Sequence, residues 1–177
     1  DINWNTRTII VGTGENNSSR SSYAGIGILK SNDNGKNWTN IGLNDSHHIG
    51  KVKINPENSD EIVVAVLGHL YSKNTERGIF KTLDGGQTWE KTLYVSDDTG
   101  IIDLDIDPNN FSIQYASSWQ KHRKAWDFVG NGKKSGIYKS TDSGQNWSLI
   151  SNQESGFPTG EGVGRIGLAV FDGNTIY

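Results

Sequence analysis

The chain has 177 residues, a net charge of −3, six tryptophans and no cysteine. The length is typical of one domain, the weakly acidic balance argues against nucleic acid or an anionic membrane as a partner, and the lack of cysteine excludes disulfide bonds. Glycine is frequent, with 22 residues, while hydrophobic residues make up only 33%, so the composition is typical of short strands joined by many turns.

Strand patterns follow one another along the whole chain. Residues 7–12 are the first predicted strand, and residues 50–54 alternate apolar and polar side chains with the period of two that marks a strand. Residues 61–67 are the most apolar segment, and residues 119–135 form a long loop. The other predicted strands cover residues 26–30, 78–81, 101–106, 113–118, 136–139, 165–170 and 175–177.

One turn motif occurs three times, each time after a strand that ends in lysine. It reads Ser/Thr, any residue, Asp, any residue, Gly, any two residues, Trp. We expect the Asp to accept hydrogen bonds from backbone amides, the Gly to supply a positive φ, and the Trp to cover the turn. The Asp, Gly and Trp of the three copies are Asp33, Gly35 and Trp38, then Asp84, Gly86 and Trp89, then Asp142, Gly144 and Trp147.

The spacing of the motifs predicts the architecture. Their Asp residues are 51 and 58 residues apart (84 − 33 and 142 − 84), which fits a four-stranded antiparallel propeller blade with some long loops. The fold class is therefore all-β, with blade parts at roughly 1–45, 46–96, 97–155 and 156–177. We expect the chain to begin just before the second strand of one blade and to end within the second strand of another. About three blades are too few for a closed propeller, so we expect a part of a longer chain.

The three turns resemble the Asp-box, or BNR repeat, of sialidase-like, xyloglucanase-like and sortilin-like β-propellers. The resemblance runs nearly end to end and is closest in kind to the N-terminal propeller of large bacterial BNR proteins related to the sortilin (VPS10) domain. It implies that the boxes lie away from the ligand face. No cofactor is expected, and the protein is expected to be secreted, periplasmic or at the cell surface. The matching motifs are residues 11–16, 48–52, 67–70, 98–100, 119–126 and 164–170.

The blade topology separates two sets of loops. Box turns and Pro turns share one face, while the loops between the second and third strands, and between blades, share the other. In propellers generally this second face carries the site. A tryptophan beside histidine and arginine binds sugars or extended peptides by stacking and orienting, although Trp119 and Trp126 could instead pack on the neighbouring loop. The predicted ligand-binding residues are Arg20, His48, His69, Tyr71, Trp119, His122, Arg123 and Trp126.

Glycoside hydrolysis would need two carboxylates across a sugar bond. The weak candidates are Glu15, Asp103, Asp105 and Glu161. Asp103 and Asp105 point to one face of a predicted inner strand, but pairing with Lys51 and Lys53, their counterparts one blade earlier, is the favoured interpretation. The Arg-Ile-Pro signature of sialidases is absent, so sialidase activity is not expected.

No metal site is predicted. His47 and His48 are adjacent and would splay apart in an extended segment, whereas His69 and His122 come from neighbouring blades and could converge with a carboxylate. Ordinary hydrogen bonding is favoured for all four histidines. An EF-hand at residues 103–114 is excluded because Pro108 stands where glycine is required.

The sequence favours recognition as the function, with a glycan or an extended polypeptide bound on the loop face. The alternatives are a xyloglucanase-like glycoside hydrolase, which leaves open whether the chain is an enzyme, and a structural subunit of a cell-envelope complex. The expected partners are that ligand, the remaining blades of the same chain and other envelope proteins. Neither a nucleic acid nor a membrane span is expected.

Overall fold

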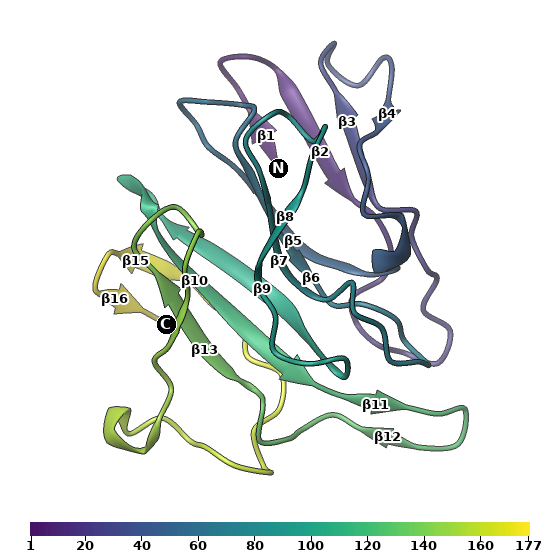
Figure 1. Ribbon diagram of the computed structural model, residues 1–177, viewed down its shortest axis with the longest axis vertical. Coiled ribbons are helices and arrows are strands. Elements are labelled where there is room, and N and C mark those ends of the chain that lie inside the picture. Colours follow the sequence, from purple (N-terminus) through teal and green to yellow (C-terminus); the bar gives the residue numbers. More distant parts are fainter.

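The computed structural model describes residues 1–177 and contains three four-stranded antiparallel sheets (Figure 1). Each sheet is a meander in which successive strands of the sheet pair, and in the third sheet the β11–β12 hairpin intervenes between the paired strands β10 and β13. The first comprises β1 (Ile2–Asn3), β2 (Thr8–Gly12), β3 (Ile28–Ser31) and β4 (Thr39–Asn40). The second comprises β5 (Ile49–Ile54), β6 (Ile62–Val66), β7 (Gly78–Thr82) and β8 (Glu90–Leu93). The third comprises β9 (Thr99–Asp107), β10 (Asn110–Gln120), β13 (Gly136–Ser140) and β14 (Ser148–Leu149).

Four further strands form two small hairpins. β11 (His122–Arg123) pairs with β12 (Phe128–Val129), and β15 (Val170–Asp172) pairs with β16 (Thr175–Ile176). Two short 3-10 helices, η1 (Asn44–Ser46) and η2 (Gln153–Ser155), follow the outermost strands of the first and third sheets. The nearly all-β architecture of four-stranded antiparallel sheets confirms the predicted fold class.

Near the two ends of the chain, the structure corrects predicted strand boundaries. Ile2 and Asn3 form a short first strand of the first sheet, whereas the sequence predicted that the chain begins just before a second strand. The pattern missed this strand because two residues are too few to show a period. The predicted strand 165–170 is reduced to its last residue, Val170. The amides of Leu168 and Val170 instead bind the carboxylates of Asp103 and Asp105, at 3.1 and 2.9 Å.

The core lies in two layers between neighbouring sheets. Ile62, Val64 and Val66 of β6 pack toward the first sheet, against Ile10 and Ile28. The intervening residues of β6, Val63 and Ala65, pack with Ile101, Leu104 and Ala116 of the third sheet. Because alternate side chains leave a strand on opposite faces, β6 is buried on both sides, which explains why it is the most apolar stretch of the chain. Each fully buried Val or Ile stabilises the stack by roughly 1.5–3 kcal/mol.

The three turn motifs share one hydrogen-bond pattern. Asp33, Asp84 and Asp142 each accept a backbone amide four residues later, at 2.9 Å in all three turns. The serine or threonine hydroxyl two positions before the Asp, and four before the Gly, donates to the same carboxylate. The glycines have positive φ values of 83°, 97° and 80°, as the motif predicts. Because the turn closes on itself, the strand pair around it has a fixed register.

The second and third motif tryptophans also reach the preceding blade. The indole Nε1 of Trp89 donates to the carbonyl of Ile41 at 2.7 Å, and that of Trp147 donates to Thr92 Oγ1 at 3.3 Å. Trp38 bonds only its own turn, through Gly35 O at 3.0 Å. Trp89 and Trp147 therefore join neighbouring sheets, whereas Trp38 only covers its turn.

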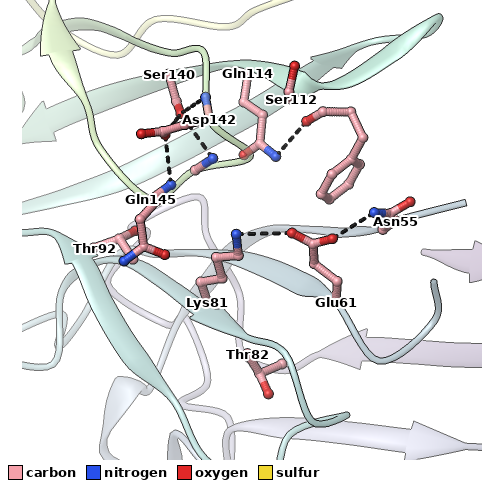
Figure 2. A network of polar contacts seen from close by, with 12 residues as sticks. Asn55, Glu61, Lys81, Thr82, Thr92, Ser112, Gln114, Ser140, Asp142 and Gln145 are labelled. Carbon is pink, nitrogen blue, oxygen red and sulfur yellow. Dashed lines mark hydrogen bonds and ion pairs between the residues drawn. The ribbon is translucent and has the colours of Figure 1, made fainter. Parts of the chain in front are cut away.

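Polar side chains line the interface between the second and third sheets at the end that carries the box turns (Figure 2). Lys81 and Glu61 form a 3.0 Å ion pair with side chains only 7% and 13% exposed. Asn55 donates to the second oxygen of Glu61 at 2.7 Å. A buried ion pair is tolerated when its remaining lone pairs are satisfied, and the Asn55 contact meets that condition.

Candidate functional site

The loops opposite the box turns gather at one end of the sheets, here termed the loop end. It is formed by residues 13–27, 67–77 and 121–135, which lie between the second and third strands of each sheet, and by residues 41–48, 94–98 and 150–163, which follow each fourth strand. Cross-contacts include Tyr71 Oη to Arg20 O at 2.5 Å, Gly25 N to His47 O at 2.6 Å and Gly132 N to Val163 O at 3.0 Å. Figure 1 shows the β11–β12 hairpin extending toward the loops of the other two sheets.

A pocket of about 340 Å³ lies where the loops of the second and third sheets meet. We term it the cationic pocket, because five of its side chains are basic and only Asp98 is acidic. Its lining residues are Leu70, Tyr71, Ser72, Lys73, Arg77, Asp98, Lys121, His122, Arg123 and Lys124. An excess of positive charge in a concave site attracts anionic ligands.

Arg77 organises the wall of the cationic pocket. It is 2% exposed and donates to the carbonyls of Leu67, His69 and Ser72 at 2.8–3.0 Å. Its planar guanidinium can hold several acceptors at fixed angles, so it fixes the loop that carries His69 and Tyr71. Burial lowers the pKa of Arg77 to about 10, and Asp98 and Asp97 partly oppose that shift, so the residue stays charged.

Lys121 and Asp98 form the floor. Lys121 is buried, and its Nζ donates to His69 O at 3.3 Å. Burial, with repulsion from Arg77 and Arg123, lowers the pKa of Lys121 to about 7. Burial alone would raise the pKa of Asp98, but hydrogen bonds from Ser96, Thr99, Lys134 and Gln120 hold it well below its usual range. Asp98 is therefore a fixed anion that is already engaged with its own partners.

The β11–β12 hairpin supplies the outer wall. Arg123 lies 4.5 Å from the Phe128 ring centre, and its Nε is buried without a hydrogen-bond partner. Trp126, at the tip of the hairpin, is 84% exposed. A buried donor without an acceptor is costly, so a shift of the Arg123 side chain that brings this N–H to an acceptor at the pocket would be favourable.

Two of the predicted ligand-binding residues are buried. Trp119 belongs to β10 rather than to the long loop, is 4% exposed, and donates to Gly130 O at 2.8 Å. Strand β10 extends to Gln120, two residues farther than the sequence predicted. Trp119 is therefore a strand residue whose side chain packs in the core. His48 is 2% exposed, and burial lowers its pKa to about 4. Neither residue presents a surface to a ligand.

The other predicted ligand-binding residues do lie at the loop end. Arg20, Tyr71 and His122 are exposed, and His69 is half-buried. His69 and Tyr71 come from the second sheet and His122 and Arg123 from the third, so the cationic pocket brings Tyr71, His122 and Arg123 together. Sequence reasoning missed Asp45, which lies 3.0 Å from His69 Nε2; its position two residues before His47 was the available signal.

The four candidate catalytic carboxylates do not form one cleft. Asp103 pairs with Lys51 at 3.6 Å and Asp105 with Lys53 at 2.7 Å, which is the pairing that the blade alignment favours. Glu161 pairs with Lys133 at 3.2 Å, and Glu15 lies exposed on a different loop. Asp103 and Asp105 therefore join the innermost strands β5 and β9 to residues 168–170.

A larger hollow, of about 880 Å³, lies on the box-turn side, between β1 and the two Pro turns. Its charged lining includes the Lys53–Asp105 ion pair, which is satisfied internally. The cationic pocket is smaller but holds the unpaired Arg123 donor and the exposed aromatics nearby, so its chemistry is better suited to recognition.

These sheets, with consecutive antiparallel strands and cores between neighbouring sheets, define blades of a β-propeller. The model of the Sortilin-Vps10 family, described as "Sortilin, neurotensin receptor 3", matches residues 27–162. The chain therefore belongs to the Sortilin-Vps10 family. No curated protein matches the sequence.

Solved structures of similar fold include GH74 enzymes. An ancestral GH74 enzyme superposes with a TM-score of 0.63 and 19% identity over 96% of this chain. The GH74 xyloglucanase from Xanthomonas campestris superposes with a TM-score of 0.57 and 13% identity over 85% of this chain. The chain spans 21% of the length of each of those proteins, and at such identities the likeness establishes the fold alone. None of the helices in the structure has the length and apolar character needed to cross a membrane.

Proposed function

We propose that this protein is a recognition β-propeller whose loop end binds an acidic group of a glycan or an extended polypeptide. The observation that carries the proposal is the cationic pocket, with five basic side chains around one carboxylate that is already hydrogen-bonded. Arg123, whose Nε has no hydrogen-bond partner, and the exposed Tyr71 line the pocket. The exposed Trp126 lies between β11 and β12, in the same hairpin as Arg123.

The balance of charge and aromatic surface supports binding rather than hydrolysis. Charge-assisted hydrogen bonds from arginine to a carboxylate or sulfate orient the ligand, and an aromatic ring can stack on a sugar or a peptide side chain. The GH74 likeness makes a polysaccharide a reasonable ligand, but Asp103 and Asp105 are both engaged with lysines. We place the ligand outside the cytoplasm, where extracellular polysaccharides and exposed polypeptides are found.

The test uses the full-length protein with three probes: polygalacturonate, neutral xyloglucan and a poly-glutamate peptide. Binding is measured by calorimetry, and new reducing ends are assayed in parallel. We expect an acidic probe to bind without turnover. The Arg123→Ala and Trp126→Ala variants should each weaken binding about tenfold, the loss of roughly one charge-assisted bond or one aromatic contact.

The matched control is Lys36→Ala, which removes an exposed cation from the first box turn at the opposite end. It should bind as the wild type does. Equal binding by Arg123→Ala and the wild type would overturn the assignment of the site. New reducing ends that depend on Asp103 or Asp105 would replace recognition with hydrolysis, and binding of no acidic probe would remove the proposal altogether.

A further inference from the structure

Three potential metal ligands meet beside the cationic pocket. Asp45 and His47 come from the loop after the first sheet, and His69 comes from the loop between β6 and β7. One ligand atom from each residue lies within 4.8 Å of the other two. The sequence favoured ordinary hydrogen bonding for these histidines, and it considered His69 with His122; the structure brings His69 to His47 instead, with ring centres 3.7 Å apart.

The distances suit a small transition-metal ion. His69 Nε2 is 3.0 Å from Asp45 Oδ1, and His47 Nε2 is 3.8 Å from the same oxygen. A tetrahedral zinc with bonds of about 2.0–2.1 Å holds its ligand atoms about 3.3 Å apart. The two observed distances lie on either side of that value. The two rings are stacked at an interplanar angle of 18°, and a metal ion lies in the plane of each imidazole that binds it, so the His47 ring would turn out of the stack, and the exposed Asp45 side chain would rotate, when an ion binds.

Two features pre-orient the ligands. The Nδ1 of His69 lies 2.8 Å from Ser72 Oγ, and such partners hold metal-binding histidines in place. The ring is oriented so that Nε2 faces Asp45, at 3.0 Å from both its carbonyl oxygen and Oδ1. His47 has φ 55° and ψ −45°, and His48 N bonds Ser46 O across it at 2.6 Å. This is a γ-turn with a positive central φ, a strained conformation that is costly for a non-glycine residue.

We infer that Asp45, His47 and His69 form a binding site for a divalent transition-metal ion such as Zn²⁺. Two imidazoles and one carboxylate are a ligand set that such ions accept, and three protein ligands leave one coordination position for water or an external group. Glu76 adds negative charge near Asp45, while Arg77 and Lys121 add positive charge at the carbonyl of His69. The ion would tie the loops of two neighbouring sheets together, and the inference does not depend on the proposed function.

The test is a calorimetric titration of the full-length protein with ZnCl₂ after dialysis against EDTA. We expect saturable binding at this site. The Asp45→Asn, His47→Asn and His69→Gln variants should each weaken it by about 10–100-fold, a loss that even outer-shell changes cause at metal sites. Asparagine is chosen at position 47 because it tolerates a positive φ. Asp45 is exposed, so Asp45→Asn provides a variant that folds.

His122→Gln is the matched control, because His122 is an exposed loop-end histidine outside the cluster. Its zinc affinity should equal that of the wild type. Substitution with Co²⁺ gives a second readout, since the visible absorption of the ion should change when imidazole nitrogens bind and should be lost in His69→Gln. Zinc binding that all three ligand variants retain, or no binding to the wild type at millimolar zinc, would overturn the inference.

Discussion

The indole of Trp89 donates a 2.7 Å hydrogen bond to the carbonyl of Ile41, which lies 48 residues earlier and belongs to the preceding sheet. The Trp89 ring also packs with Ile41 against the core between the first two sheets. One side chain therefore fastens its own hairpin to the neighbouring sheet.

Removing this tryptophan should be costly. Trp89→Ala should lower the free energy of unfolding by about 3–5 kcal/mol, because a large partly buried ring leaves a cavity. Trp89→Phe should lose only about 1 kcal/mol, since it keeps most of the packing and lacks the hydrogen bond. Urea denaturation of the full-length protein measures both changes. Trp38→Ala is the control, because the Trp38 ring is 42% exposed and bonds only its own turn; a loss there as large as at Trp89 would contradict the role assigned to the contact between sheets.

The box carboxylates should make stability depend on pH in acid. Amide and side-chain hydrogen bonds from Asn146 lower the pKa of Asp142 to about 2 in the folded chain. A carboxyl whose pKa is lower in the folded than in the unfolded chain stabilises the protein at pH values above its unfolded-state pKa. This contribution is lost as the pH falls through the folded-state pKa. Thermal unfolding midpoints should therefore decline between about pH 4 and pH 2, and Asp142→Asn should flatten part of that decline. Glu57→Gln, an exposed carboxyl in a Pro turn, should leave the profile unchanged.

Two glycines with positive φ should respond differently to a methyl group. Gly78 has φ 120°, and a Cβ there would lie 1.8 Å from Leu93 O; Gly156 has φ 74° with nothing within 4 Å. Gly156→Ala should cost about 1–2 kcal/mol for the backbone alone. Gly78→Ala adds a clash with the neighbouring strand and should cost at least about 3 kcal/mol. Equal losses in denaturant titrations would show that the β7–β8 contact can relax.

Trp119 and Trp126 make a matched pair seven residues apart. Trp119→Ala should lower stability by about 3–5 kcal/mol because its ring is buried. Trp126→Ala should leave stability within about 0.5 kcal/mol, since the ring is 84% exposed. Only the second variant can therefore report on ligand binding without a change in folding. A large loss of stability in Trp126→Ala would mean that the hairpin tip packs on another part of the full-length protein.

The turn motifs and the strand alternation were enough to predict the blades, because both are local properties of the sequence. The pairing of Asp103 with Lys51 and Asp105 with Lys53 also followed from aligning one blade with the next. Trp119 was misplaced because no local signal showed that β10 continues to Gln120. The meeting of His47 with His69 depends on a γ-turn and on two loops from different sheets, and neither has a sequence pattern.

Trp89 bonds Ile41, and Trp147 bonds Thr92. These two acceptors occupy equivalent positions in the repeat, since each lies eight residues after the motif aspartate of its own blade (33 + 8 and 84 + 8). One uses a main-chain carbonyl and the other a side-chain hydroxyl. The second blade thus carries both a donor for its predecessor, Trp89, and an acceptor for its successor, Thr92, at fixed places in its own sequence. A gene segment copied as one such unit would bring both halves of its attachments with it, so a new blade could be inserted without a compensating change elsewhere.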